Sequence, residues 1–262
     1  MKKQLRKIIT LPKFLINKIY FTNWKNKFSE DRCIIMGNGP SLNKMDLSLF
    51  QDEYVWGSNR CYLLYPRINW RPKFYVAVDT RVTPDIKDDL NKLINTDLDT
   101  SFFFPSKFRE SKILHSNKNV YWYKEVPQSR EDLPYSYFSM NPAKFLYSVN
   151  TVTAAALQLA VYMGFNPIYL IGCDTSYAVK KSVKFENGNK DLLISSDDDN
   201  NHFDPSYFGE GKKWHAPKVE NMIHNYEQVK AVCDEIGVEV FNATVGGNLE
   251  VFPRVNYLDL FD

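Results

Sequence analysis

The chain has 262 residues, of which 44% are hydrophobic, so its composition excludes a disordered protein and allows a sizeable core. The net charge of +2 excludes an overall field that would attract nucleic acid, and no nucleic-acid partner is expected. The four cysteines form no C-x-x-C pair, which favours buried thiols in a reducing, cytoplasmic compartment over disulfides or a zinc site.

The first 28 residues form a basic amphipathic segment, with eight lysines and arginines, no acidic residue and interleaved apolar side chains. Pro12 interrupts any single helix, and no apolar run approaches the ~20 residues that span a bilayer. Lysines within the apolar stretch also argue against a cleaved signal peptide. Two interpretations remain open: peripheral contact with the anionic inner face of the plasma membrane, or packing as a surface helix on the domain.

Three predicted strands come next. Residues 32–37 are apolar and end at Gly37, in a turn where Ser41 is placed to cap the residues that follow. Strands over residues 54–58 and 73–78 follow. All three are apolar almost throughout, which is typical of strands buried on both faces of a parallel sheet.

The middle of the chain contains one helix and two more strands. A helix is predicted over residues 83–95, where apolar residues recur at helical spacing. Strands are predicted over residues 101–104 and 120–123. Residues 124–147 are aromatic and interrupted by proline, so we expect a loop that acts as a lid.

A clear alternation returns in the second half of the chain. An alanine-rich helix over residues 151–163 ends at Gly164 and leads into a buried strand over residues 167–174. Residues 178–215 are predicted to form a second lid-like loop. Its acidic run, residues 197–199, is expected to be solvated.

A long helix over residues 216–236 and a last parallel strand over residues 238–242 complete the pattern. Strands that alternate with helices and are apolar throughout predict an α/β fold, with a Rossmann-like, mostly parallel sheet and helices on both faces. No internal boundary is visible, so residues 29–262 are expected to form a single domain.

Small, amide and carboxylate residues stand at the ends of the predicted strands. Ligands bind beyond the carboxyl ends of open parallel sheets, where glycine permits close approach and amides can hydrogen-bond a nucleotide. The glycines match neither a P-loop nor the dinucleotide fingerprint. The candidate nucleotide-binding residues at these ends are Gly37, Asn38, Gly39, Pro40, Ser41, Asn59, Asp79, Gly172 and Asp174.

One polar and aromatic stretch, residues 200–217, holds two candidate general bases, His202 and His215. Histidine titrates near neutrality and can accept a proton in catalysis. His215 directly precedes the predicted long helix, whose positive end would keep its imidazole neutral, so it is the first candidate and His202 the second. His115 and His224 are expected to be surface or packing residues.

Three blocks, residues 34–42, 59–61 and 151–174, resemble two related groups of proteins. One is the bacterial sialyltransferase family numbered 42 among glycosyltransferases. The other includes archaeal 6-hydroxymethylpterin pyrophosphokinases and the flagellin-glycosylating motility accessory factors. The Gly-Asn-Gly-Pro-Ser-Leu block is the most specific part, and the similar regions span most of residues 32–245 at low identity.

The sialyltransferase resemblance implies a GT-A-like variant of the fold and a metal-independent, inverting transfer of sugar. The donor would be CMP-linked and the acceptor a glycan or glycolipid of the bacterial surface, in lipopolysaccharide or capsule. The resemblance places Asn38, Asn59 and Thr151 at the nucleotide. It makes Tyr177 the tyrosine that assists the leaving phosphate, and a histidine the base.

Departures from the family pattern leave the donor sugar open, because Val149 replaces an arginine and Asp79 an amide. Asp79 is followed by Arg81 and so lacks the Asp-x-Asp that holds a divalent ion in metal-dependent glycosyltransferases. No metal and no cofactor are therefore expected. The alternatives are a pyrophosphokinase-like enzyme using ATP and Mg²⁺ held by Asp79 and Asp174, or a non-catalytic nucleotide- or glycan-binding module. A homo-oligomer and a monomer are both open.

Overall fold

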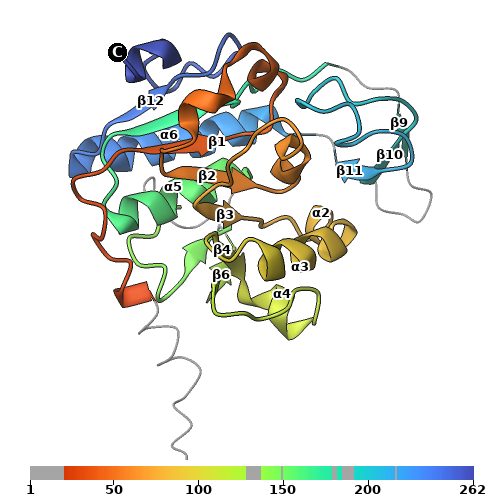
Figure 1. The fold of residues 1–262 in the computed structure, drawn as a ribbon, viewed down its shortest axis with the longest axis horizontal. Helices are drawn as coiled ribbons and strands as arrows, with labels where there is room; N and C mark the ends of the chain where they lie inside the picture. The colour runs from red at the N-terminus through yellow and green to blue at the C-terminus, as the bar shows by residue number, and fades with distance from the viewer. Residues whose placement is uncertain (1–20, 128–136, 149, 179–181, 185–191, 216) are drawn as a thin grey trace, which may run out of the picture.

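A seven-stranded parallel sheet forms the centre of the molecule (Figure 1). The computed structural model describes residues 21–127, 137–148, 150–178, 182–184, 192–215 and 217–262. The strand order is β12-β8-β1-β2-β3-β4-β5, and every neighbouring pair is parallel. The strands are β1 (Cys33–Met36), β2 (Val55–Ser58), β3 (Phe74–Val76), β4 (Ser101–Pro105), β5 (Val120–Tyr123), β8 (Ile168–Ile171) and β12 (Val240–Asn242).

This sheet confirms the predicted α/β, Rossmann-like fold. Each strand is a run of apolar residues because both of its faces are covered. In β1, Cys33 and Ile35 join the core on one face, whereas Ile34 and Met36 join the core on the other. The chain continues from β1 to β2 on one side, and β8 pairs with β1 on the other side. The order therefore reverses at β1, where open sheets of this kind bind ligands.

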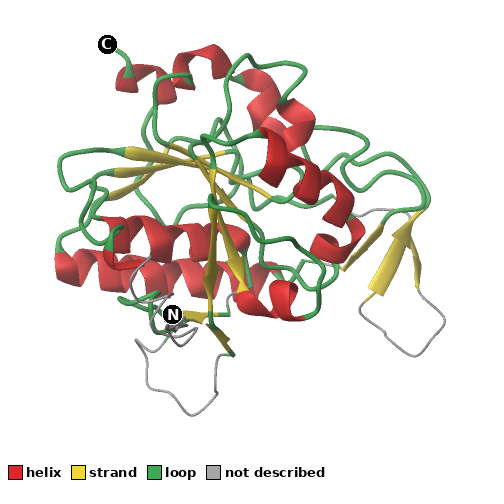
Figure 2. Cartoon of the chain, turned by 60° about the horizontal axis from the view of Figure 1, so that its bottom comes forward, coloured by secondary structure: helices red, strands yellow, loops and turns green. Residues whose placement is uncertain are grey.

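Helices cover both faces of the sheet (Figure 2). One face carries α5 (Val152–Met163) and α6 (Val219–Ile236), which contact each other. The other face carries shorter helices. These are α2 (Val82–Asp85), α3 (Lys87–Thr96), α4 (Ser106–Glu110) and the 3₁₀ helices η1 (Pro40–Lys44), η2 (Leu47–Phe50), η3 (Cys61–Leu64) and η4 (Tyr257–Leu260).

Two predicted helices differ from the observed ones. The helix expected over residues 83–95 is divided into α2 and α3, because the backbone of Ile86 leaves the helical region with φ −110° and ψ 16°. The long helix expected from residue 216 begins at Val219, after Pro217, because proline disfavours a helical backbone for the residue that precedes it.

The loop expected over residues 178–215 contains a small antiparallel sheet, so that prediction is wrong in part. The sheet consists of β9 (Ser182–Lys184), β10 (Leu192–Ser195) and β11 (Lys213–His215), and it projects from the body of the molecule in both views (Figures 1 and 2). Strands of three or four residues in a polar segment give too little periodicity to be recognised. A short parallel pair, β6 (Glu125–Val126) and β7 (Leu146–Tyr147), likewise lies within the expected lid over residues 124–147.

Residues 21–28, grouped by charge with the N-terminal segment, pack into the core. Phe21, Trp24 and Phe28 are buried against aromatic rings of the sheet. Backbone N–H groups of this segment also donate to the last carbonyls of α5, at 3.1 Å from Asn26 to Tyr162 and 2.9 Å from Phe28 to Met163. The expectation that the basic segment contacts a membrane or packs as a surface helix now concerns residues 1–20, which lie outside the described residues.

The described part of the chain contains no helix that is long and apolar enough to cross a membrane. All four cysteines are buried and free, as their apolar surroundings in the sequence predict.

Candidate functional site

A cleft of about 490 Å³ opens at the carboxyl ends of β1, β2, β3 and β8 and at the first turn of α5. It lies at the point where the strand order reverses, as expected for a sheet of this topology. Residues far apart in the sequence meet there. The candidates that line the cleft are Gly37, Asn38, Gly39, Asn59, Asp79, Thr151, Gly172, Asp174, Tyr177 and His202.

The two glycines after β1 are required by close packing against the end of β8. A Cβ atom on Gly37 would lie 2.3 Å from the carbonyl oxygen of Gly172. A Cβ atom on Gly39 would lie 1.8 Å from Oδ2 of Asp174. Each distance is far below van der Waals contact, so glycine lets the two strand ends form one floor of the cleft.

Asp174 fixes the turn after β1. Its carboxylate accepts hydrogen bonds from the hydroxyl of Ser41 at 2.6 Å and from the Ser41 backbone N–H at 3.2 Å. Ser41 therefore does not cap the turn as expected; Gly39 occupies the N-cap position of η1 and Pro40 begins it. Pro40 and Ser41 support the floor from outside the lining of the cleft.

Asn38 and Asn59 present carboxamides at the ends of β1 and β2. The Nδ2 of Asn38 donates to the Ser58 hydroxyl at 3.1 Å and to its carbonyl at 3.3 Å. Asn59 adopts a left-handed backbone, with φ 50°, that Asn tolerates better than most residues. Among the described residues, neither Oδ1 atom has a hydrogen-bond partner although both are buried. Both residues line the cleft, so each unused acceptor lies next to the space that a ligand would fill.

Asp79 stands at the end of β3 and organises the start of α2. Its Oδ1 accepts from the backbone N–H of Arg81 at 2.7 Å and of Val82 at 3.0 Å. These two backbone N–H groups orient the Asp79 carboxylate. Within the described ranges, no group of three or more His, Cys, Asp or Glu side chains is arranged to hold a metal ion.

His202 forms a pair with a buried carboxylate beside this floor. Its Nδ1 lies 2.8 Å from Oδ2 of Asp199, whose side chain is only 1% exposed. An ionised carboxylate can only accept, so Nδ1 donates in this contact, and in the neutral imidazole the lone pair then lies on Nε2. The imidazole also stacks on the Tyr207 ring, with centroids 4.0 Å apart. The ring is therefore held in one orientation and in one tautomer.

The expectation that residues 197–199 form a solvated run is wrong for Asp199. Besides His202, its carboxylate accepts from the backbone N–H of Asn201 at 2.9 Å and of Phe208 at 2.9 Å. The same loop is joined to the first strand end, because the Phe203 N–H donates to the Asn38 carbonyl at 3.0 Å. The pairing of Asp199 with His202 gave no signal in the sequence, where the carboxylate belongs to an ordinary acidic cluster.

His215 occupies a different place from the expected one. It ends β11, paired in register with Leu192, and three residues separate it from the start of α6 at Val219. The helix-dipole argument for His215 is therefore weaker than its position in the sequence suggests, since the dipole acts within about one turn of the helix end. The orientation of its side chain lies outside what the structure describes.

Tyr177 lines the cleft beside α6. Its hydroxyl lies 3.9 Å from Sδ of Met222. Burial of the hydroxyl, helped by the nearby Cys173 and Asp174, raises the pKa of Tyr177 to about 12. The hydroxyl is protonated at neutral pH, as that of an ordinary tyrosine is, and it can donate a hydrogen bond.

Two polar residues of α6 hold the first turn of α5 at the cleft. Thr151 caps α5, accepting from the Thr153 N–H at 3.3 Å, and its hydroxyl lies 3.3 Å from the Tyr226 hydroxyl. Oδ1 of Asn225, a residue only 2% exposed, accepts from both N and Nδ2 of Asn150, at 2.8 and 2.9 Å. Asn150, Asn225 and Tyr226 were not among the candidates, because polar residues within a long helix give no positional signal.

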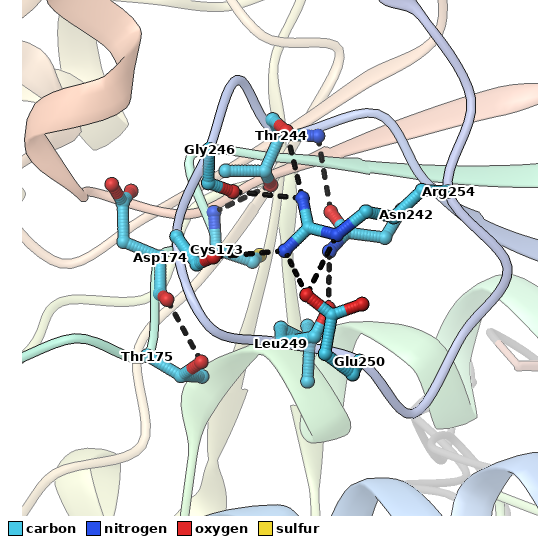
Figure 3. Close-up of polar contacts among 10 residues, drawn as sticks. Cys173, Asp174, Thr175, Asn242, Thr244, Gly246, Leu249, Glu250 and Arg254 are labelled. Carbon is cyan, nitrogen blue, oxygen red and sulfur yellow. Dashed lines mark hydrogen bonds and ion pairs between the residues drawn. The ribbon is translucent and has the colours of Figure 1, made fainter.

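The loop after β12 is hydrogen-bonded to the end of β8, as Figure 3 shows. The Arg254 guanidinium donates to the carbonyls of Thr244, Gly246 and Gly247 at 3.3, 2.8 and 2.9 Å. The loop that it closes contacts the end of β8, where the Cys173 N–H donates to the Thr244 hydroxyl at 3.1 Å. The carbonyl of Asp174 likewise accepts from the Asn248 N–H at 2.7 Å. These bonds fix the backbone that carries Asp174.

The model of one protein family, described as 6-hydroxymethylpterin diphosphokinase MptE-like, matches residues 5–180 of the chain. Among solved structures, the MAf glycosyltransferase from Magnetospirillum magneticum AMB-1 is 14% identical, with a TM-score of 0.47 over 93% of this chain; the chain spans 38% of that enzyme. The sialyltransferase CstII from Campylobacter jejuni, in complex with the substrate analogue cytidine-5′-monophosphate, is 15% identical, with a TM-score of 0.46 over 86% of this chain and 84% of that one. Comparison with curated proteins gives no match.

Proposed function

The chain belongs to the 6-hydroxymethylpterin diphosphokinase MptE-like family, and on this premise we propose that the cleft binds a nucleotide and transfers a group from it to a hydroxyl. The transferred group that the site supports best is a sugar, so the protein is proposed to be a glycosyltransferase with a CMP-linked donor. The resemblance of residues 34–42 to the sialyltransferase motif supports this donor class. The acceptor is proposed to be a glycan or glycolipid of a bacterial surface.

The observation that carries the proposal is the pair of Asp199 and His202, in a loop whose Phe203 N–H donates to the backbone carbonyl of Asn38 at the floor of the cleft. An acceptor hydroxyl is a weak nucleophile until its proton leaves in the transition state. Nε2 of His202 would take that proton, and the Asp199 carboxylate would stabilise the imidazolium that forms. This arrangement makes His202 the proposed base, ahead of His215.

In the proposed reaction, the acceptor oxygen bonds to the anomeric carbon of the donor while the bond from that carbon to the phosphate oxygen breaks. The hydroxyl proton passes to His202, and the nucleotide leaves with the bonding electron pair on its phosphate. Attack from the face opposite the leaving group inverts the anomeric centre. Tyr177, whose hydroxyl lines the cleft and is protonated at neutral pH, would donate a hydrogen bond to the departing phosphate oxygen.

The experiment is a transfer assay with CMP-linked donors, run beside a thermal-shift screen of CMP, UDP, GDP and ATP. We expect CMP to stabilise the wild type. His202→Ala should lower kcat at least ~100-fold with little change in CMP binding, because a positioned histidine contributes about 10² to 10⁴. His224→Ala is the matched control, since that histidine is exposed on α6, and it should keep full activity. Loss of activity in His215→Ala but not in His202→Ala would show that His215, and not His202, is the base.

A second candidate function is transfer of diphosphate from ATP, which the family match itself favours. That reaction needs Mg²⁺ at the phosphates, with Asp79 as the carboxylate that faces the cleft. Asp174 is a poorer ligand because Ser41 engages both of its oxygens. Turnover that collapses in EDTA and returns with Mg²⁺ would establish the diphosphokinase; we expect turnover to persist.

A further inference from the structure

A row of aromatic rings extends from His202 along one wall of the cleft. The His202 and Phe208 centroids are 5.2 Å apart and nearly perpendicular, and the Phe208 and Trp214 centroids are 6.4 Å apart with their planes within 25°. Phe208 and Trp214 are half-buried, and both line the cleft. We refer to Phe208 and Trp214 together as the aromatic shelf.

The small antiparallel sheet positions the outer member of the shelf. Trp214 is the middle residue of β11 and is paired in register with Leu193 of β10. β11 also contacts α2, which follows Asp79 at the end of β3. The inner member is fixed by its backbone, since the Phe208 N–H donates to Asp199 at 2.9 Å, and by the Arg60 guanidinium, 5.9 Å from the ring centre. The shelf is therefore supported on both sides.

We propose that the aromatic shelf is the binding surface for the acceptor sugar, an inference that rests on the proposed glycosyltransferase function. One face of the His202 imidazole is covered by Tyr207, and its Nδ1 is engaged by Asp199. An acceptor hydroxyl can reach this base only at Nε2. A sugar whose hydroxyl lies within hydrogen-bond reach of Nε2 is next to the Phe208 ring, whose centroid is 5.2 Å from that of His202.

The chemistry of the shelf suits a neutral sugar. The C–H groups on one face of a pyranose pack against the negative face of an aromatic ring, which buries apolar surface without desolvating the hydroxyls on the sugar's edge. The proposed nucleotide site lies at other residues of the cleft, namely Asn38, Asn59 and the capped start of α5. The shelf therefore governs the choice of acceptor rather than the affinity for the donor.

The test compares Trp214→Ala with Trp214→Phe, using methyl β-D-galactoside and methyl β-D-glucoside as acceptor probes and CMP as the donor-site probe. Binding of each probe is measured by NMR titration of the folded protein. We expect Trp214→Ala to weaken glycoside binding about tenfold while the Kd of CMP changes less than twofold, and Trp214→Phe to restore most of the glycoside affinity. Phe261→Ala, which removes a half-buried ring far from the cleft, is the matched control.

The outcomes separate this inference from the function on which it rests. Unchanged glycoside affinity in Trp214→Ala, or no glycoside binding to the wild type, would overturn the shelf as an acceptor surface. Weaker CMP binding in Trp214→Ala with unchanged glycoside binding would assign the shelf to the nucleobase and also overturn it. A wild type that binds the glycosides but neither CMP nor a CMP-sugar would instead remove the proposed donor.

Discussion

At the scale of single residues, the sequence identified the strand-end positions but not Asp199, the carboxylate that orients the imidazole of His202. Asn38, Asn59 and Asp79 could be predicted because a parallel sheet brings every carboxyl strand end to one edge. Asp199 could not, because a carboxylate three residues from His202 in an irregular loop has no period or motif that marks it as buried. Its role depends on the fold of residues 199–208 as a whole.

Replacement of Asp199 by Asn tests the orientation of the base. The amide removes the negative charge that would stabilise an imidazolium, and its N–H₂ group can turn toward Nδ1 and favour the wrong tautomer. We expect kcat to fall at least ~100-fold with the Kd for nucleotide nearly unchanged. Asp198→Asn, on an exposed neighbour, is the control and should behave as the wild type.

Replacement of Gly39 by Ala tests the floor of the cleft. The added methyl would meet the Asp174 carboxylate at 1.8 Å, so the turn must move or the bonds from Asp174 to Ser41 must break. We expect a loss of nucleotide binding and a lower Tm. Gly211→Ala is the control, because its Cβ meets nothing within 4 Å and only the left-handed backbone, φ 77°, opposes it, at about 1 kcal/mol. Equal effects of the two variants on nucleotide binding would contradict the steric argument.

At the scale of elements, long apolar segments were predictable and short polar ones were not. Seven strands of the central sheet and helices α5 and α6 follow from runs of apolar residues and from the glycines that end those helices. The three strands β9 to β11 are held by pairing with one another, and such pairing has no local signature in a polar sequence. The hydrogen bonds from α6 to the start of α5 also join residues about 75 positions apart, so no local sequence pattern predicts them.

The contact between α5 and α6 gives a prediction at this scale. Asn225→Leu removes the oxygen that accepts both hydrogen bonds from Asn150 and leaves two donors without their partner. We expect a loss of about 1–3 kcal/mol in the free energy of unfolding and weaker nucleotide binding. Asn225→Asp keeps an accepting oxygen and should restore nucleotide affinity. A purely structural role would leave nucleotide affinity unchanged in the folded Leu variant. Asn221→Leu, on the exposed side of α6, is the control.

At the scale of the whole molecule, burial divides the basic N-terminal segment, which the sequence suggests is one unit of 28 residues, into two parts at residue 21. Residues 21–28 are part of the core, whereas residues 1–20 carry six basic residues and no acidic one. We expect the full chain to sediment with vesicles containing anionic phosphatidylserine and to be released by 0.5 M salt, because screening shortens the reach of exposed charges to a few Å. The measurement is a co-sedimentation assay.

A chain that starts at residue 21 is the control for this prediction. It keeps Phe21, Trp24 and Phe28 and should retain the Tm of the full chain while losing vesicle binding. Removal of residues 1–28 should lower the Tm, since it also removes these three buried rings. Equal sedimentation of the full chain and the chain from residue 21 would contradict the prediction that residues 1–20 bind the membrane.

The burial of α5 has a geometric consequence for the segment that begins at Phe21. The first turn of this helix forms part of the cleft, and its last carbonyls accept hydrogen bonds from residues 26 and 28. The helix has 12 residues, so these two ends are ~18 Å apart along one rigid axis. The segment that begins at Phe21 is therefore fixed at the end of α5 opposite the cleft. Its attachment to α5 leaves the first turn of the helix free for a substrate in the cleft.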